Sequence, residues 1–237
     1  MSFNPSKCNI LRTRALPTRN TIQRLYTLHG QVLHEVNHAK YLGVLISNDL
    51  SWTPHIDYIS KKANQKLGFL KRNLRGSPIS SKKLAYTSLI RSGLEYAASV
   101  WDTSLKKDIT KLERVQRRSA RWVKSQYSTY DTSVDAMLSD LGWATLADRR
   151  KNLRLILLYQ IYHTERNLIA IDHSEVDLVK NTRPHRTAKH LKQIHRPKVG
   201  LKSTIPKTIN EWNSLSDALV CADPDSFKGQ LATAVNP

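Results

Sequence analysis

The stretch TPHIDYISKKANQKLGFLKRNL, residues 53–74, decides the fold class of this chain. Thr53 followed by Pro54 is a typical helix start, because a threonine can cap the free N–H groups and proline lacks the N–H that would be unpaired there. Gly76-Ser77-Pro78 predicts the end of the helix. Apolar residues recur between these signals at steps of three and four, which is the period of an amphipathic helix. They are Ile56, Ile59, Ala63, Leu67, Leu70 and Leu74.

The same period continues downstream and predicts a helical bundle over residues 51–166. Further helices are expected at about residues 80–101, 105–127 and 133–141, and a fifth begins after a Thr145 cap. In the fifth helix one side is expected to face the core and the other side solvent. The core side holds Leu146, Leu153, Ile156, Leu157 and Ile161, and the solvent side holds Arg149, Arg150, Lys151 and Arg154.

The two ends of the chain are predicted to differ from the bundle. Residues 1–50 contain short β-rich runs and a glycine at a hairpin turn, His29-Gly30-Gln31, which predicts a small antiparallel β element. Residues 167–204 lose periodicity and are basic and histidine-rich, which predicts a linker or an extended arm. Short helices are expected again at about residues 206–215 and 224–233. The predicted fold class is mainly α, with a small N-terminal antiparallel β element, a helical bundle and an irregular basic tail over residues 167–237.

The charge balance requires an acidic partner. The 237 residues include 38 Lys and Arg against 19 Asp and Glu, a formal net charge of +19. The excess is concentrated: nine basic residues and no acid lie between Asp57 and Glu95, and nine more lie between Asp177 and Glu211. Ordinary solvated helix faces would interleave acids with these cations. The sequence therefore predicts binding to nucleic acid.

The sequence shows neither a membrane span nor a catalytic motif. No apolar run approaches the roughly 18 residues that span a bilayer, and the first residues do not resemble a secretory signal. We therefore expect an intracellular protein without a membrane partner, and the sequence does not distinguish nucleus from cytoplasm. Cys8 and Cys221 are far apart, only Glu35 and Asp49 are acidic in the first fifty residues, and no metal site or cofactor is predicted. Asp102 and Asp108 flank a helix start, where the helix dipole favours acids.

Two of the predicted helices carry cations largely opposite their apolar side. This arrangement lets the apolar side pack while the cations meet a phosphate backbone. The candidate phosphate contacts are Lys61, Lys62, Lys66, Arg72 and Arg75 on the first helix and Arg114, Arg117, Arg118 and Arg121 on the third.

Several longer strings occur in one order along nearly the whole chain. They are FNPSKC (3–8), KYLGV (40–44), LSWTPHI (50–56), LGFLKRNL (67–74), LEYAASVW (94–101), LERVQRR (112–118) and WN (212–213). In this order and spacing they resemble the C-terminal part of the reverse transcriptase of jockey-type non-LTR retrotransposons, which are LINE-like elements.

The resemblance implies a role for several segments. Residues 1–50 match the end of the polymerase palm, and Lys7 matches a lysine thought to help protonate the pyrophosphate leaving group, although the sequence by itself favours an ordinary surface lysine. Tyr41, Leu42 and Gly43 match the primer-grip hairpin, for which a plain core strand is the alternative. Residues 51–166 match the thumb, which follows the template-primer duplex of RNA and DNA, and the remainder matches a tail of less defined role.

The departures from the family are equally informative. The fingers, the metal-binding Asp residues of the palm and the endonuclease domain are missing, so Mg²⁺ is expected only for the full-length polymerase and this chain alone is expected to be inactive. Met1 resembles an internal residue of a longer reading frame, as in a fragment or a truncated element copy. Two hypotheses remain: a polymerase fragment that grips primer-template when joined to its palm and fingers, and a stand-alone basic nucleic-acid-binding module without enzymatic activity.

Overall fold

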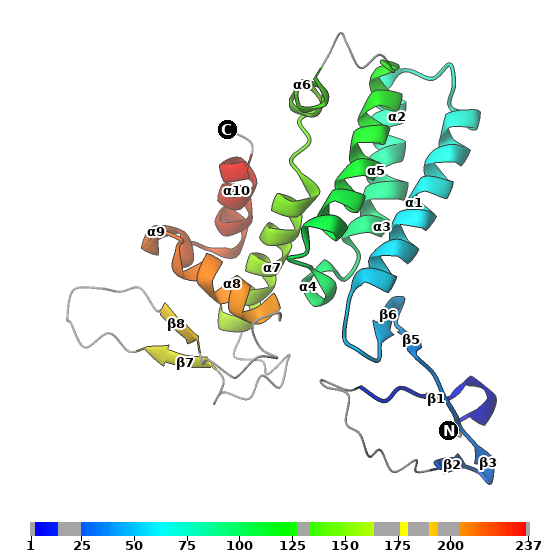
Figure 1. Cartoon of the computed structure of the whole chain (residues 1–237). Coiled ribbons are helices and arrows are strands. Elements are labelled where there is room, and N and C mark those ends of the chain that lie inside the picture. Colours follow the sequence, from blue (N-terminus) through cyan, green and yellow to red (C-terminus); the bar gives the residue numbers. More distant parts are fainter. Residues whose placement is uncertain are drawn as a thin grey trace. The chain divides into compact units, whose positions relative to one another are not determined.

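The computed structural model describes residues 3–13, 25–127, 133–163, 176–179, 190–193 and 204–235. The chain divides into two compact units, residues 1–59 and 60–237. In the first unit a short 3-10 helix, Pro5–Lys7, precedes six short strands (Figure 1). The strands are β1 Asn9–Ile10, β2 Thr27–Leu28, β3 Gln31–Val32, β4 His34–Glu35, β5 His38–Tyr41 and β6 Val44–Ser47.

These strands confirm the small N-terminal β element but not all of its predicted pairing. β2 and β3 form an antiparallel hairpin around His29 and Gly30, whose φ angles of 48° and 75° suit a tight hairpin turn. β5 and β6 form a second antiparallel hairpin. β1 and β4, however, pair in parallel, which corrects the antiparallel prediction for this pair. Strands joined by one tight turn must be antiparallel. β1 and β4 are instead connected by a segment that contains the whole β2–β3 hairpin, and this longer connection allows them to run in parallel.

The first predicted helix is confirmed as α1, Thr53–Asn73. Its buried residues include Ile56, Ala63 and Leu67, the apolar stripe on which the prediction depended. The Leu74 N–H donates to the Leu70 carbonyl at 2.8 Å as the helix ends, before Gly76 and Pro78.

The second predicted helix is not continuous. It comprises α2 Ile79–Ala85, a π-helical segment η2 Tyr86–Arg91, α3 Ser92–Glu95 and α4 Ala98–Trp101. The break occurs at Ala97, whose φ of 53° is left-handed. Such a conformation costs roughly 1–2 kcal/mol for a residue with a side chain. Burial of Trp101, whose indole N–H donates to the Tyr96 carbonyl at 2.8 Å, offsets that cost.

The remaining predicted helices are confirmed within a few residues. Ser133 accepts from the Asp135 N–H at the start of α6, and Thr145 accepts from the Asp148 N–H at 3.0 Å at the start of α7. The Asp223 carboxylate accepts from the Ser226 N–H at 3.0 Å at the start of α10. These helices are α5 Lys106–Lys124, α6 Val134–Asp140, α7 Leu146–His163, α8 Thr204–Asn213 and α10 Pro224–Val235, and a short helix that was not predicted, α9 Asp217–Val220, lies between the last two. None of the helices in the described residues combines the length and apolar character needed to cross a bilayer.

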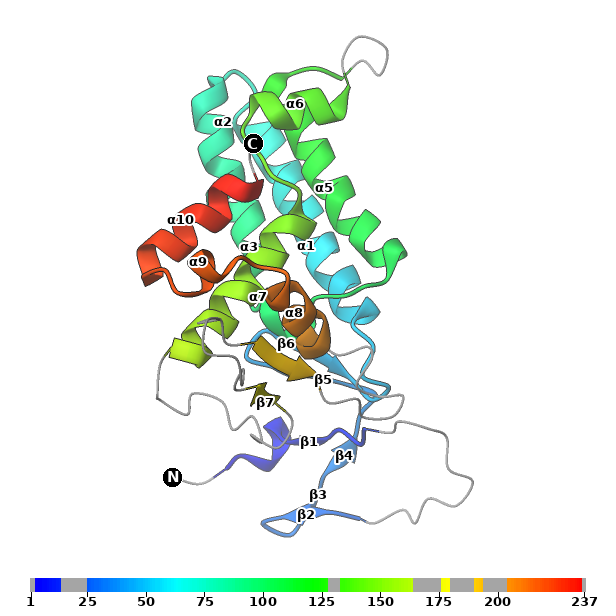
Figure 2. The ribbon, with the colours of Figure 1, turned by 90° about the vertical axis from the view of Figure 1, so that its left-hand side faces the viewer.

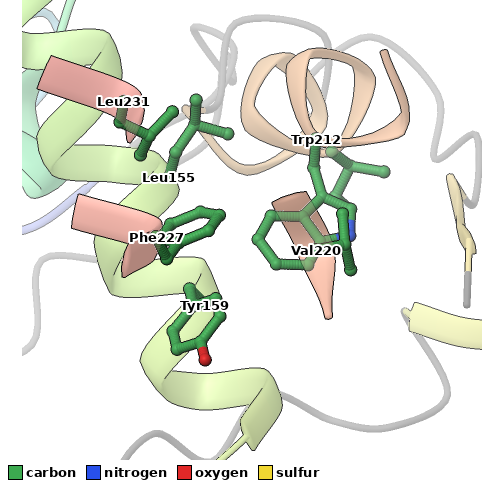
Figure 3. Close-up of a cluster of buried hydrophobic side chains, with 7 residues drawn as sticks. Leu155, Tyr159, Trp212, Val220, Phe227 and Leu231 are labelled. Carbon is green, nitrogen blue, oxygen red and sulfur yellow. The ribbon is translucent and has the colours of Figure 1, made fainter. Parts of the chain in front are cut away.

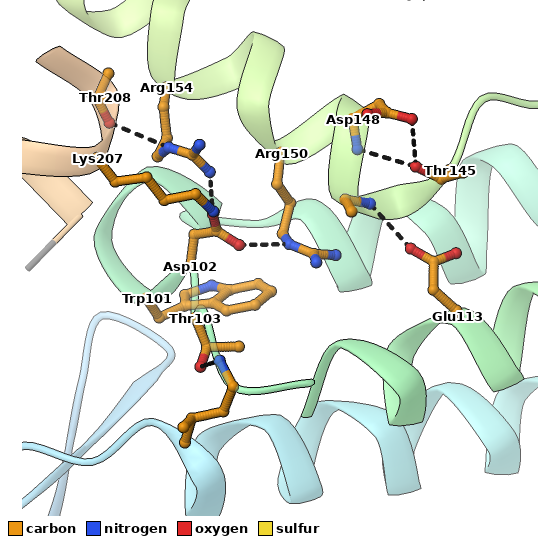
Figure 4. Close-up of polar contacts among 12 residues, drawn as sticks. Trp101, Asp102, Thr103, Glu113, Thr145, Asp148, Arg150, Arg154, Lys207 and Thr208 are labelled. Atoms are coloured by element: carbon orange, nitrogen blue, oxygen red, sulfur yellow. Dashed lines mark hydrogen bonds and ion pairs between the residues drawn. The ribbon is translucent and has the colours of Figure 1, made fainter. Parts of the chain in front are cut away.

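α7 is enclosed rather than amphipathic, which corrects the prediction that Arg150 and Arg154 face solvent. It packs against α4, α5, α8 and α10. Arg150 and Arg154 are only 1% and 2% exposed, because both pair with the buried carboxylate of Asp102 (Figure 4). The Arg150 Nε–Asp102 Oδ1 distance is 2.7 Å. Asp102 is therefore the centre of a buried ion cluster, not a surface acid that complements a helix dipole.

The C-terminal helices are joined to α7 by this ion cluster and by an apolar cluster. Arg154 pairs with Glu211 and donates to Thr208 at 3.1 Å, and Lys207 lies 3.3 Å from Asp102. α8 and α10 lie alongside α7 in both views (Figure 1 and Figure 2). The buried apolar cluster consists of Leu155, Tyr159, Ile209, Trp212, Val220, Phe227 and Leu231 (Figure 3).

Two strands lie within the segment predicted to be irregular. β7 Val176–Val179 and β8 His190–Gln193 pair in an antiparallel arrangement. Most of residues 167–204, the predicted linker or arm, lies outside the described residues.

Candidate nucleic-acid interface

The solvent face of α5 is a basic strip. The opposite face is buried and includes Leu112, Val115 and Val123. Of the two acids in the helix, Asp108 is buried and Glu113 is turned inward, where it accepts from the Ala147 N–H at 2.9 Å. The cations on the remaining positions are Lys106, Lys107, Lys111, Arg114, Arg117, Arg118, Arg121 and Lys124.

The four arginines predicted on this helix do not share one environment. Arg114, Arg117 and Arg118 are exposed, as a phosphate contact requires. Arg121 is half-buried, and its Nε has no hydrogen-bond partner among the described residues. At the two ends of the strip acids neutralise part of the charge, since Lys111 lies 3.7 Å from Asp108 and Lys124 lies 3.1 Å from Asp140.

Of the five cations predicted on the first helix, four are exposed. They are Lys61, Lys62 and Arg72 of α1 and Arg75, which lies just beyond the last residue of α1, Asn73. The fifth, Lys66, is half-buried and donates from Nζ to the Leu89 carbonyl of η2 at 2.8 Å. Lys66 therefore holds α1 to η2, and it is the least suitable of the five for a phosphate contact.

The structure brings α1 and α5 together through residues that sequence reasoning did not connect. Arg118 Nη1 donates to Asn64 Oδ1 at 3.3 Å. Lys71, two turns beyond Asn64, is half-buried, and its Nζ lies 5.7 Å from the centre of the Tyr127 ring. Burial lowers the pKa of the Lys71 ammonium, and the positive charge of Arg118 lowers this pKa further. Sequence analysis missed Lys71 because it borders the apolar stripe; its seven-residue spacing from Asn64 is the signal that places both on one side of α1.

Tyr41, Leu42 and Gly43 lie at the tip of the β5–β6 hairpin. Leu42 and Gly43 form its turn, with φ angles of 45° and 87°. The Tyr41 and Leu42 side chains are 66% and 73% exposed, so Tyr41 does not have the surroundings of a core-strand residue, whereas Val44 is buried. The tip thus presents an aromatic and an aliphatic side chain to solvent.

His55 in the first turn of α1 holds this hairpin. Its Nδ1 accepts a hydrogen bond from the Leu45 N–H at 3.2 Å, which requires the imidazole to be neutral at Nδ1. Burial lowers the pKa of His55 to about 4, because the charged form would lose its hydration. Lys40 in β5 donates to the Tyr58 hydroxyl at 3.1 Å and so adds a second link between the hairpin and α1.

Lys7 is exposed at the end of the short helix Pro5–Lys7. Asn4 caps this helix by accepting from the Ser6 N–H at 3.0 Å. No group of three or more His, Cys, Asp or Glu side chains in the described ranges is arranged to hold a metal ion.

Comparison with known proteins gives one distant relative. The chain is similar to a probable RNA-directed DNA polymerase from transposon BS of Drosophila melanogaster, with 23% identity over 124 residues. The match covers 51% of this chain and 14% of that polymerase, so the chain corresponds to a small part of its length. No protein-family model matches the chain, and no solved structure matches it. The chain is thus distantly homologous to the reverse transcriptase of a transposon.

Proposed function

We propose that the chain is the end of the palm, the thumb and the tail of the reverse transcriptase of a jockey-type non-LTR retrotransposon, and that it grips the template-primer duplex. Three features support this proposal. They are the ordered strings of the sequence, the distant homology to a transposon polymerase, and the helical unit with its basic helix faces. In this proposal the β5–β6 tip is the primer grip and Lys7 is the lysine near the leaving group, while Mg²⁺ belongs to the full-length polymerase. The partners are RNA and DNA.

One observation carries the duplex-binding part of the proposal: the outer side of α5 has eight cations, five of them fully exposed, and no exposed acid. The cations extend over the whole helix, a length of roughly 27 Å at a rise of 1.5 Å per residue. Guanidinium and ammonium groups bind phosphate oxygens without reading bases. Affinity for a duplex is therefore expected to depend little on sequence and steeply on salt.

The test is a titration of the whole chain with a DNA or RNA–DNA duplex at several salt concentrations. Arg114 and Arg117 are both exposed, so replacing both with Gln removes two phosphate contacts. The slope of log K against log salt is expected to become shallower by about 1.8, since each phosphate contributes about 0.9. A matched control replaces Lys83 of α2 and Lys228 of α10, which are exposed outside the α1 and α5 faces, with Gln. An equal decrease in the salt slope of the two double variants would contradict an interface on α5.

The alternative, a stand-alone basic nucleic-acid-binding module without enzymatic activity, uses the same surface. In the first hypothesis a polymerase palm adds the catalytic site to this duplex-binding surface, and in the second the chain binds nucleic acid by itself. Addition of the matching palm and fingers should give primer extension that depends on Arg114 and Arg117 if the chain is the thumb. Duplex binding with no gain of extension in the joined protein would favour the alternative.

A further inference from the structure

An exposed aromatic ring lies on the side of α1 that is turned away from α5. α5 meets α1 at Asn64, where Arg118 donates to the Asn64 side chain. Phe69 follows Asn64 by five residues, a rotation of about 140° around the helix axis, so the two side chains leave the helix in different directions. Phe69 is 55% exposed.

The π-helical segment η2 runs beside this side of α1. Lys66, one turn before Phe69, donates from Nζ to the Leu89 carbonyl of η2 at 2.8 Å. The same Nζ lies 3.7 Å from the position that a Cβ atom would take at Gly93. The Leu89 side chain is 47% exposed. Phe69 and Leu89 therefore present apolar surface to solvent from two neighbouring elements.

Cations lie on both sides of the Phe69 ring along α1. Lys62 precedes Phe69 by seven residues, close to two full turns, so both project from the same side of the helix. Arg72 folds back toward the ring, since its Nη1 lies 3.8 Å from the position of a Cβ atom at Gly68, the residue before Phe69. Both cations are exposed. We call the group Lys62, Phe69, Arg72 and Leu89 the Phe69 platform.

An aromatic ring between cations suits an unpaired nucleotide. Every base has a π-face that can stack on an aromatic side chain, while Lys and Arg meet the phosphates before and after it. Bases inside a duplex are already stacked on their neighbours, so only an unpaired strand can place a base on Phe69. A protein partner fits less well, because the cores of protein interfaces are depleted of lysine and here Lys62 borders the apolar surface. No acid of the sequence between Asp57 and Glu95 would repel a phosphate.

We propose that the Phe69 platform binds an unpaired strand that continues from the bound duplex, with one base stacked on Phe69 and its flanking phosphates at Lys62 and Arg72. Leu89 borders the stacked base. This inference rests on the proposed duplex binding. It adds to that function a preference for a junction between duplex and single strand over a blunt duplex.

The experiment compares three DNA ligands by fluorescence anisotropy with the whole chain at one salt concentration. They are a blunt duplex, the same duplex with an adenine overhang of about eight nucleotides, and the same duplex with an abasic overhang of equal length. The two overhangs carry the same phosphates and differ only in the bases. The parent protein is expected to bind the adenine overhang more tightly than the abasic one.

The variant Phe69→Leu keeps an apolar side chain and removes the ring. Its affinity for the adenine overhang should fall by roughly 5- to 150-fold, the range that corresponds to one stacked base. Its affinity for the blunt and abasic ligands should equal that of the parent. Phe69→Trp, which keeps a stacking surface, should retain the preference for adenine. An equal loss on the abasic overhang would overturn the stacking role of Phe69.

The matched control is Tyr127→Leu. Tyr127 is also an exposed aromatic residue, at 61%, but its ring lies 5.7 Å from Nζ of Lys71, which shares the α5 side of α1 with Asn64. This variant should bind all three ligands as the parent does. A loss on the adenine overhang as large as that of Phe69→Leu would overturn the location of the stacked base.

Failure of the platform is distinguishable from failure of duplex binding. Absence of binding to the blunt duplex would remove the proposed function, whereas a preference for adenine that depends on Phe69 would still support the platform. Duplex binding without a preference for adenine over the abasic overhang would overturn the platform alone. An acidic amphipathic peptide of Glu and Leu is the last arm. Binding of this peptide that depends on Phe69, without a preference for adenine, would identify a protein-docking surface and overturn the assignment to a single strand.

Discussion

Asp102→Asn tests whether the buried ion cluster holds the C-terminal helices to the bundle. Asp102 is 5% exposed and is the shared partner of Arg150 and Arg154, which are 1% and 2% exposed. Asn keeps the shape and one acceptor oxygen but removes the charge. Arg154 retains Glu211, whereas Arg150 loses its one ion-pair partner in the described part of the chain.

The expected cost follows from this burial. Removing one member of a buried ion pair typically costs 3–5 kcal/mol, and since Asn retains one hydrogen bond we expect about 3 kcal/mol of lost unfolding free energy. The matched control is Asp140→Asn, because the Asp140 carboxylate is 66% exposed and pairs with Lys124 at 3.1 Å. An exposed pair of this kind contributes about 0–1 kcal/mol.

Urea unfolding followed by tryptophan fluorescence measures both variants, since Trp101 and Trp212 are buried near the cluster and in the apolar cluster. Hydrogen exchange locates the effect. Lys207, Thr208 and Glu211 of α8 all contact the cluster, so amides of α8 should lose more protection than those of α5. An Asp102→Asn variant within about 1 kcal/mol of the parent, or uniform loss of protection, would refute the reasoning.

Three further outcomes are expected. The pKa of His55 is lowered from 6.5 to about 4, so the free energy of unfolding is highest above pH 6.5 and falls by about 2–3 kcal/mol as the pH drops from 6.5 to 4. Urea unfolding of the His55→Asn variant, which keeps a hydrogen-bond acceptor for the Leu45 N–H, should not show this loss. Ala97→Gly should raise the free energy of unfolding by about 0.5–1 kcal/mol, because glycine adopts a positive φ without strain, and a lower stability would contradict the left-handed break. Thr110→Glu places a carboxylate in the α5 strip, four residues before Arg114, and should weaken duplex binding without loss of helix stability, while Thr110→Gln should bind as the parent does.

The sequence predicts those parts of the fold that local signals determine. α1 follows from a threonine-proline start, a regular apolar stripe and a Gly-Ser-Pro end, all within residues 53–78. The caps at Thr145 and Asp223 are equally local. The break at Ala97 was not predicted, because no glycine or proline marks it; it is accompanied by the burial of Trp101, which depends on tertiary packing.

Features that depend on partners far along the chain were not predicted. Arg150 and Arg154 appear in a run of basic residues typical of a solvated face, and their acids lie 48 to 57 positions away. The basic face of α5 was predictable because one helix contains the whole pattern. The hydrogen bond between Arg118 and Asn64 was not, since it joins residues that are 54 positions apart.

The basic surface arises from where the few acids lie as much as from the number of cations. In the helical unit, Glu95 pairs with Arg149, Asp102 with Arg150 and Arg154, and Glu113 accepts a backbone N–H, so these acids neutralise groups inside the bundle. The cations of α5 are therefore left with little nearby negative charge, and fields of one sign add over a surface. The interior ion pairs and the surface cations therefore have different roles in this chain. A change to an interior acid should act on stability, whereas a change of charge on the α1 and α5 faces should act on the affinity and salt dependence of duplex binding.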